Sequence, residues 1–208
     1  VIYGESGSGK TAFLNRISGQ ELPLQRENFA ITDLEHPGDS YMIFQNPDHQ
    51  IIGRNLLSEL AFTAECSGLD PSEIEKIVAD GLDMLPYRFD PTRNPTFLSG
   101  GEKEMLNLIT AMQTQSPVIL IDDGLSFLSE SNKKEFIIAL KRWSQTEQKI
   151  IVWVTSEWTD LEYSDSRWRL DLSSFIPVDD KEKQDYHQVS IASGQLTLLA
   201  QNLVFRYD

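Results

Sequence analysis

The sequence predicts an α/β fold in which a mainly parallel sheet carries an inserted helical segment. Two runs of residues, 118–121 and 149–155, are mostly apolar, which is typical of parallel strands that are covered on both faces. A helical pattern over 131–145 separates these runs, and residues 55–115 show helical patterns alone. A glycine-rich turn at 4–11 joins a short apolar segment to another helix. Alternating strands and helices form parallel α/β sheets, and the all-helical stretch predicts an insertion.

The glycine-rich turn, GESGSGKT, has the G-x-x-x-x-G-K-[ST] spacing of a phosphate-binding loop. An apolar segment precedes it and a helical pattern follows it, which is the context that this motif requires. Glycines permit a turn that directs several backbone N–H groups, and the positive end of the next helix, at one anion. The candidate phosphate-binding residues are Gly4, Ser6, Gly7, Ser8, Gly9, Lys10 and Thr11.

Two of these residues have side chains suited to a nucleotide. Lys10 provides a mobile positive charge for the β- and γ-phosphates, and the Thr11 hydroxyl is placed to bind Mg²⁺. We therefore expect ATP or GTP, with Mg²⁺, at this loop. The alternative is a glycine-rich turn that contains an ordinary lysine.

The composition excludes several classes of protein. The 208 residues carry a net charge of −14 and no long basic cluster, whereas nucleic-acid-binding surfaces need clustered positive charge. The single cysteine, Cys66, excludes an internal disulfide and a thiolate metal cluster. This cysteine lies in an apolar stretch, which predicts a packed thiol. No apolar run is long enough to span a membrane, so a role at a membrane would need a partner.

The region after the first helix begins with a loop. Residues 20–39 are rich in charges, with proline and glycine, and predict a loop with a short edge strand at 29–32. The apolar run 41–44 predicts a strand that ends at Gln45-Asn46-Pro47-Asp48. Two helices then occupy 55–86, and Pro71 opens the second of them.

The next helix has a local start signal. Ser99 and Glu102 have the spacing of a capping box, and apolar residues follow at three- and four-residue intervals. The buried strand at 118–121 then ends at Asp122 and Asp123. Two acids that close a strand are either solvated or part of a site.

These short elements, in this order, resemble the ATP-binding-cassette (ABC) ATPases. GESGSGKT resembles the Walker A loop, FQNPD at 44–48 the Q-loop, LSGGE at 98–102 the ABC signature, and VILIDD at 118–123 Walker B. The resemblance extends to about residue 175, and the segments 45–51 and 58–62 are most similar to energy-coupling-factor and cobalt-type importer ATPases. It implies a P-loop NTPase fold, with an ABC ATPase domain over 1–178 and a helical subdomain inserted at about 48–115.

The resemblance also implies roles for individual residues. Two cassettes pack head to tail, and each nucleotide lies between the Walker motifs of one cassette and the signature of the other. Asp122 would hold Mg²⁺ through water, and Gln45 would reach the same ion and the attacking water. The residues that would bind the γ-phosphate on the opposite cassette are Ser99, Gly100 and Gly101. The implied metal ligands are Thr11, Gln45 and Asp122.

The sequence departs from the family pattern on the hydrolytic side. Asp123 replaces the glutamate that polarises water, Ser129 replaces the D-loop aspartate, and Ser156 replaces the histidine after the last core strand. The histidines lie in polar stretches, where we expect surface residues: His36, His49 and His187. We hypothesise that the cassette binds MgATP firmly and hydrolyses it slowly, while its signature completes the site of a partner. The candidate catalytic residues are Asp123, Gln45 and Ser156.

Both ends of the sequence suggest a larger arrangement. Only three residues precede Gly4, so we expect the amino-terminal β-subdomain to be truncated. Residues 179–194 predict a charged linker, and 195–208 predict a strand. This strand resembles the opening of a second cassette, with Tyr207 at an adenine-stacking position. Alternatively it is an ordinary carboxy-terminal element, or it folds back to fill the missing place.

The expected function is that of the ATP-binding subunit of an importer. The expected partners are a second cassette, in trans or in the same chain, and an integral membrane transporter subunit, without nucleic acid. The expected location is cytoplasmic, peripheral at the inner face of the cell membrane. The alternatives are a non-transport ABC clamp in DNA repair or translation, and a catalytically inactive regulatory cassette.

Overall fold

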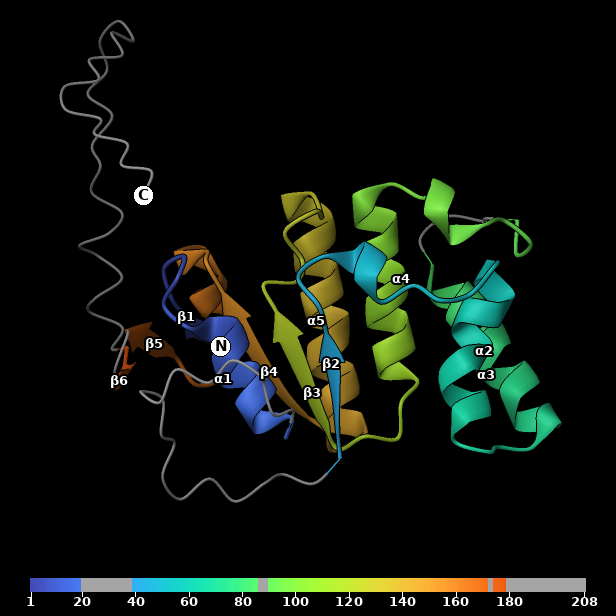
Figure 1. Ribbon diagram of the computed structural model, residues 1–208, viewed down its shortest axis with the longest axis horizontal. Helices are drawn as coiled ribbons and strands as arrows, with labels where there is room; N and C mark the ends of the chain where they lie inside the picture. Colours follow the sequence, from blue (N-terminus) through green and yellow to red (C-terminus); the bar gives the residue numbers. More distant parts are fainter. Residues whose placement is uncertain (20–38, 86–89, 172–173, 179–208) are drawn as a thin grey trace, which may run out of the picture. The chain divides into compact units, whose positions relative to one another are not determined.

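A six-stranded sheet with the order β2-β3-β4-β1-β5-β6 forms the centre of the part of the chain that the structure describes (Figure 1). The structure is a computed structural model, and it describes residues 1–19, 39–85, 90–171 and 174–178. Val1–Pro177 form one compact unit and Val178–Asp208 another, and the elements below belong to the first. The strands are β1 Ile2–Tyr3, β2 Ser40–Ile43, β3 Val118–Asp122, β4 Ile150–Thr155, β5 Trp168–Asp171 and β6 Ser174–Pro177.

The sheet is mainly parallel, as predicted. The pairs β2–β3, β3–β4, β4–β1 and β1–β5 are parallel, and β6 is antiparallel to β5. The register places Ile43 opposite Ile121, and Asp122 opposite Val154. Because the carboxyl ends of parallel strands lie at one edge, the residues that follow β1, β2, β3 and β4 meet there.

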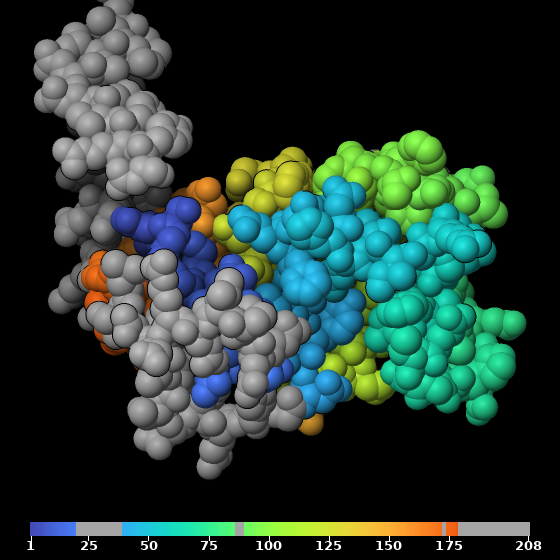
Figure 2. Space-filling view, in the orientation of Figure 1, coloured from blue at the N-terminus to red at the C-terminus, as the bar shows by residue number. Residues whose placement is uncertain are grey.

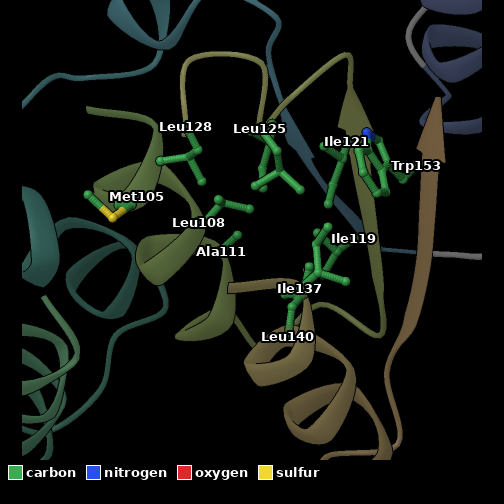
Figure 3. Packing of buried hydrophobic residues seen from close by; sticks show 11 residues of the cluster. Met105, Leu108, Ala111, Ile119, Ile121, Leu125, Leu128, Ile137, Leu140 and Trp153 are labelled. Carbon is green, nitrogen blue, oxygen red and sulfur yellow. The ribbon is translucent and has the colours of Figure 1, made fainter. Parts of the chain in front are cut away.

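Helices pack on both faces of this sheet. Ile119 and Ile121 of β3 contact α4 and α5 in one apolar cluster (Figure 3), whereas Val118 and Leu120 contact α1 in another. This division explains why the strand is apolar at every position from 118 to 121. The α-helices are α1 Lys10–Ile17, α2 Leu56–Cys66, α3 Pro71–Met84, α4 Gly100–Met112 and α5 Glu130–Thr146. The short 3₁₀ helices are η1 Pro47–His49, η2 Pro95–Phe97 and η3 Trp158–Tyr163.

The inserted helices have their own apolar cluster and well-capped starts. Leucine and isoleucine side chains of this cluster come from α2, α4 and the segments next to α3 and α4: Leu56, Leu60, Leu85, Leu98, Leu106 and Ile109. Pro71 begins α3, as predicted. The predicted capping box is also present, because Ser99 N donates to Glu102 Oε2 at 2.6 Å and Glu102 N donates to Ser99 Oγ at 3.4 Å. The region from β2 to η1 contacts α4, and Figure 2 shows one continuous surface there.

Two predictions about burial were wrong. Strand β4 is buried only over its second half, and Ile150 is 61% exposed. On the β4 side, the short β1 pairs with Val154 and Thr155 alone, so it does not flank the start of β4. Cys66 is exposed, because it is the last residue of α2 and lies beyond the buried face that Leu60 and Ala64 form.

Several predictions lie outside the described residues. They concern the edge strand at 29–32, the linker at 179–194, the strand at 195–208, and the residues His36, His187 and Tyr207. His49 lies within η1 and is exposed, as predicted.

Candidate functional site

A cavity of about 310 Å³ opens at the carboxyl edge of the sheet, and we call it the Walker cavity. Its walls come from four separate segments of the chain, which the parallel strands bring together. The lining residues are Ser6, Gly7, Gly9, Lys10, Thr11, Ala12, Gln45, Asp122, Asp123 and Ser156. Every predicted catalytic residue and metal ligand therefore lies at one site.

The glycine-rich loop has the backbone that the motif predicts. Gly7 and Gly9 have φ angles of 81° and 95°, in the left-handed region that glycine adopts without strain. Gly9 directly precedes α1, so the helix N-terminus faces the loop. Gly4 and Ser8 do not line the cavity, and they lie so close together that a Cβ at Gly4 would be 2.4 Å from Ser8 Oγ.

Lys10 lies across the inside of this loop. Its ammonium group donates to the carbonyl oxygens of Gly4 at 2.8 Å and Glu5 at 3.1 Å. An ammonium group has three donor hydrogens, and these carbonyls take two of them. The buried Lys10 therefore presents a positive charge to the cavity while it orders the loop.

Thr11 and Asp122 meet at the base of the cavity. Thr11 Oγ1 donates to Asp122 Oδ2 at 2.8 Å, although the two residues are 111 positions apart. Burial raises the pKa of Asp122 and the charge of Asp123 adds to this, whereas the hydrogen bond from Thr11 and the charge of Lys10 lower it. A hydroxyl and a carboxylate oxygen are ligands that suit Mg²⁺, so this pair fits the expected ion.

The Asp123 carboxylate is bound by Ser156. The Ser156 backbone N–H donates to Asp123 Oδ1 at 2.9 Å, and its hydroxyl donates to Oδ2 at 2.7 Å. Gln45 Nε2 donates to the same Oδ2 at 3.4 Å. The three candidate catalytic residues thus form one hydrogen-bonded group, in which serine holds both oxygens of the acid.

The signature residues lie in a second cavity, of about 380 Å³, which we call the signature cavity. Ser99, Gly100 and Gly101 form its wall at the start of α4. A Cβ would lie 2.9 Å from Phe127 Cδ1 at Gly100, and 2.9 Å from Phe127 O at Gly101. Position 101 therefore requires glycine, whereas the neighbour of Gly100 is a side-chain ring that is 55% exposed and can shift. The remaining lining residues are Glu102, Met105, Phe127, Leu128, Ser129 and Asn132.

The Walker and signature cavities share no lining residue. The structure therefore brings Walker A, Gln45, Walker B and Ser156 together, and it keeps the signature apart from them within this unit. The predicted roles of both groups remain predictions.

A set of buried charges near these cavities was not among the residues predicted from the sequence. Glu104, Lys133 and Asp160 are at most 5% exposed, and each contacts a segment next to one of the cavities. One signal was available, because Glu104 lies on α4 among apolar residues that form the buried face of that helix. A charge at such a position is rarely buried without a partner.

No helix in the described part of the chain is both long and apolar enough to cross a membrane.

Comparison with known proteins gives consistent relatives. Residues 1–126 match a protein family described as "ABC transporter". The chain is 27% identical over 184 residues to the energy-coupling factor transporter ATP-binding protein EcfA1 of Latilactobacillus sakei, covering 85% of this chain and 65% of that protein. It is 31% identical over 172 residues to EcfA1 of Thermotoga maritima, covering 79% and 63%. The chain thus spans less than two thirds of the length of these relatives.

Solved structures of low sequence identity share the fold. The cbiO1 protein of Clostridium perfringens, part of the ABC transporter complex cbiONQ, matches with a TM-score of 0.70 at 19% identity, covering 89% of this chain and 78% of that chain. An ATP-binding cassette solved as a dimer with ADP and phosphate matches with a TM-score of 0.69 at 22% identity, covering 86% and 84%. Because the family match covers more than half of the chain and the fold agrees, the chain belongs to the ABC transporter family, with the P-loop fold of its ATPase cassettes.

Proposed function

We propose that the chain is the ATP-binding subunit of an importer of the energy-coupling-factor kind, and that it binds MgATP in the Walker cavity. One observation carries the proposal: Thr11 of Walker A and Asp122 of Walker B share a hydrogen bond of 2.8 Å beside Lys10. The importer assignment is supported by relatives whose names describe ATP-binding proteins of energy-coupling factor transporters.

The loop supplies groups for the triphosphate. The left-handed backbone at Gly7 and Gly9 directs N–H groups toward one point, where the N-terminus of α1 adds a positive potential. Lys10 would neutralise charge on the β- and γ-phosphates. Mg²⁺ would be held by Thr11, Gln45 and Asp122, and it would offset charge on the same phosphates.

Hydrolysis in this cavity should be slow. Asp123 is one methylene shorter than the glutamate of the family pattern, and a misplacement of about 1 Å can cost roughly 100-fold in rate. Ser156 also hydrogen-bonds to both oxygens of this carboxylate, which leaves fewer of their lone pairs for an attacking water. We therefore propose tight binding with little turnover at the Walker site.

The signature would act on a partner. Its helix N-terminus and the glycines at 100 and 101 provide N–H groups for an anion, yet the nucleotide of the same chain would lie in the other cavity. A second cassette would therefore bring its nucleotide to this signature. An integral membrane subunit would complete the transporter, with this chain at the inner face of the cell membrane in the cytoplasm.

Changing Asp122 to asparagine should remove the effect of Mg²⁺ on nucleotide binding. We expect the unsubstituted chain to bind a fluorescent ATP analogue about tenfold or more tightly with Mg²⁺ than with a chelator, since the ion offsets phosphate charge. The amide of the substituted side chain cannot supply the negative charge, so the two affinities should become nearly equal. The measurement is a fluorescence titration with and without Mg²⁺.

The matched control is Asp165→Asn, because the side chain of Asp165 is 91% exposed and pairs only loosely with Lys141 at 3.3 Å. This control should keep the full Mg²⁺ effect. A Mg²⁺ effect that survives in Asp122→Asn would contradict the proposed metal site.

The bond between Asp123 and Ser156 also favours a second candidate, a regulatory cassette that binds nucleotide without hydrolysing it. Single-turnover phosphate release separates the two. A slow but measurable release that depends on Lys10 supports a weak ATPase, and no release above that of Lys10→Ala supports the regulatory cassette.

A further inference from the structure

One buried carboxylate holds the backbone of the loop between the two cavities. This loop, residues 124–129, follows Walker B directly, and its last three residues line the signature cavity. Glu104 of α4 accepts the N–H of Leu125 at 2.5 Å and of Ser126 at 3.1 Å through Oε1. It accepts the N–H of Phe127 at 3.0 Å through Oε2. Three successive N–H groups therefore converge on one side chain.

The conformation of this loop requires such support. Asp123 and Leu125 have φ angles of 50° and 77°, in the left-handed region that disfavours residues other than glycine. Backbone of this kind persists only where the surroundings determine it. The Leu125 side chain is fully buried in the apolar cluster between sheet and helices, and the bonds to Glu104 fix the backbone next to it.

The negative charge of Glu104 suits three donors. An ionised carboxylate only accepts hydrogen bonds, whereas a glutamine in its place would turn an NH₂ group toward at least one N–H. Burial raises the pKa of Glu104, while the N–H bonds from Phe127, Leu125 and Ser126 and the charge of Lys133 lower it. Burial has the largest effect and the net shift of this pKa is upward. The geometry makes the case for a carboxylate, because both oxygens accept N–H groups and a glutamine of the same length cannot make all three bonds.

A buried ion pair supports the segment that contains Ser156, the residue that binds the Asp123 carboxylate. Lys133 of α5 forms an ion pair with Asp160, and these side chains are 6% and 2% exposed. Asp160 Oδ2 accepts the Thr155 hydroxyl at 2.6 Å. Ser156 comes next in the chain and holds the Asp123 carboxylate. Two segments that adjoin Asp123, the 124–129 loop and Thr155–Ser156, thus form hydrogen bonds with buried charged side chains.

We propose that Glu104 is a positioning residue for both cavities. Its carboxylate fixes the backbone of the 124–129 loop. This loop in turn positions the Asp123 carboxylate in the Walker cavity and forms part of the wall of the signature cavity. The part that concerns hydrolysis rests on the proposed function of the Walker cavity. The part that concerns the loop does not.

The test compares Glu104→Gln with Glu59→Gln. Glu59 is an equally buried carboxylate, 3% exposed like Glu104, and it accepts the N–H groups of Ile52 at 2.8 Å and Gly53 at 2.5 Å in another loop. Hydrogen–deuterium exchange by mass spectrometry reports on both loops. Glu104→Gln should accelerate exchange of the amides at 125–127 by roughly tenfold to hundredfold, the effect of losing bonds to a charged acceptor. Both N–H groups that Glu59 accepts reach one oxygen, Oε2, which the amide oxygen of glutamine can replace. Glu59→Gln should therefore accelerate exchange less than Glu104→Gln does, and only at 52 and 53.

The same variants separate binding from chemistry. Glu104→Gln should bind MgATP within about twofold of the unsubstituted chain, yet its single-turnover hydrolysis should fall by about tenfold or more, because Asp123 is displaced. Glu59→Gln should leave both quantities unchanged. Glu104→Asp keeps the charge with a shorter reach, so its exchange rate at 125–127 should lie between those of the unsubstituted chain and Glu104→Gln. This variant replaces Glu104→Gln in the test if Glu104→Gln does not fold.

Unchanged exchange at 125–127, or equal acceleration throughout the chain, would overturn the role of Glu104. A hydrolysis rate that falls equally in both glutamine variants would also overturn it. If the unsubstituted chain binds no MgATP, the proposed function fails instead, and the exchange comparison alone decides whether Glu104 positions the loop.

Discussion

Replacing Lys10 with alanine is expected to weaken MgATP binding by about 100-fold or more. The ammonium group is buried in the Walker cavity, where a charge-assisted bond to phosphate contributes roughly 1.5–3 kcal/mol. The substitution also removes the bonds to the carbonyls of Gly4 and Glu5, which order the loop. Isothermal titration calorimetry with MgATP measures the loss directly.

Lys141→Ala is the matched control for this change. The Lys141 side chain is 40% exposed and pairs with Asp165 at 3.3 Å, away from the residues that line the Walker cavity. An exposed pair contributes little, so this variant should bind MgATP like the unsubstituted chain. Equal affinity in Lys10→Ala and Lys141→Ala would show that the loop does not bind the triphosphate.

Combining Asp123→Glu with Ser156→His is expected to raise single-turnover hydrolysis by about 100-fold. Glutamate restores the reach toward water, and the second change removes the serine hydroxyl that occupies Asp123 Oδ2 at 2.7 Å. Histidine is the residue that the family resemblance implies at this position. Because the two residues contact each other, either change alone should have a smaller effect than half of the combined gain in activation free energy.

Rapid-quench measurement of phosphate release tests this gain. The control adds Lys10→Ala to the pair, and it should abolish the activity because the triphosphate would no longer be held. A double variant that is no faster than the unsubstituted chain would show that Asp123 and Ser156 do not limit hydrolysis.

Parts of the site that depend on neighbouring residues could be predicted from the sequence. The glycines of the Walker A loop and the Ser99–Glu102 capping box are local signals, and the structure contains both as predicted. The family resemblance implied that Thr11 and Asp122 bind one ion, and the structure brings them together because two parallel strands end at the same edge of a sheet. The motifs and their order in the chain were therefore needed, beside strand and helix alternation, to expect the Walker residues at one site.

Contacts that depend on packing at a distance could not be predicted. Glu104 binds N–H groups that lie 21 to 23 residues later, and no pattern in either segment indicates the pairing. The bond from Ser156 to Asp123 spans 33 residues, and the sequence showed only that both residues depart from the family pattern. Cys66 was placed wrongly because an apolar stretch does not show where the buried face of its helix ends.

The most direct test of the central claim measures MgATP binding and phosphate release on one sample of the unsubstituted chain. We predict a clear heat of association at micromolar to millimolar MgATP, together with phosphate release about 100-fold or more below the 1–10³ s⁻¹ typical of enzymes. Brisk release that Lys10→Ala abolishes, or no heat of association at millimolar MgATP, would contradict the claim that this cassette binds nucleotide and turns it over slowly.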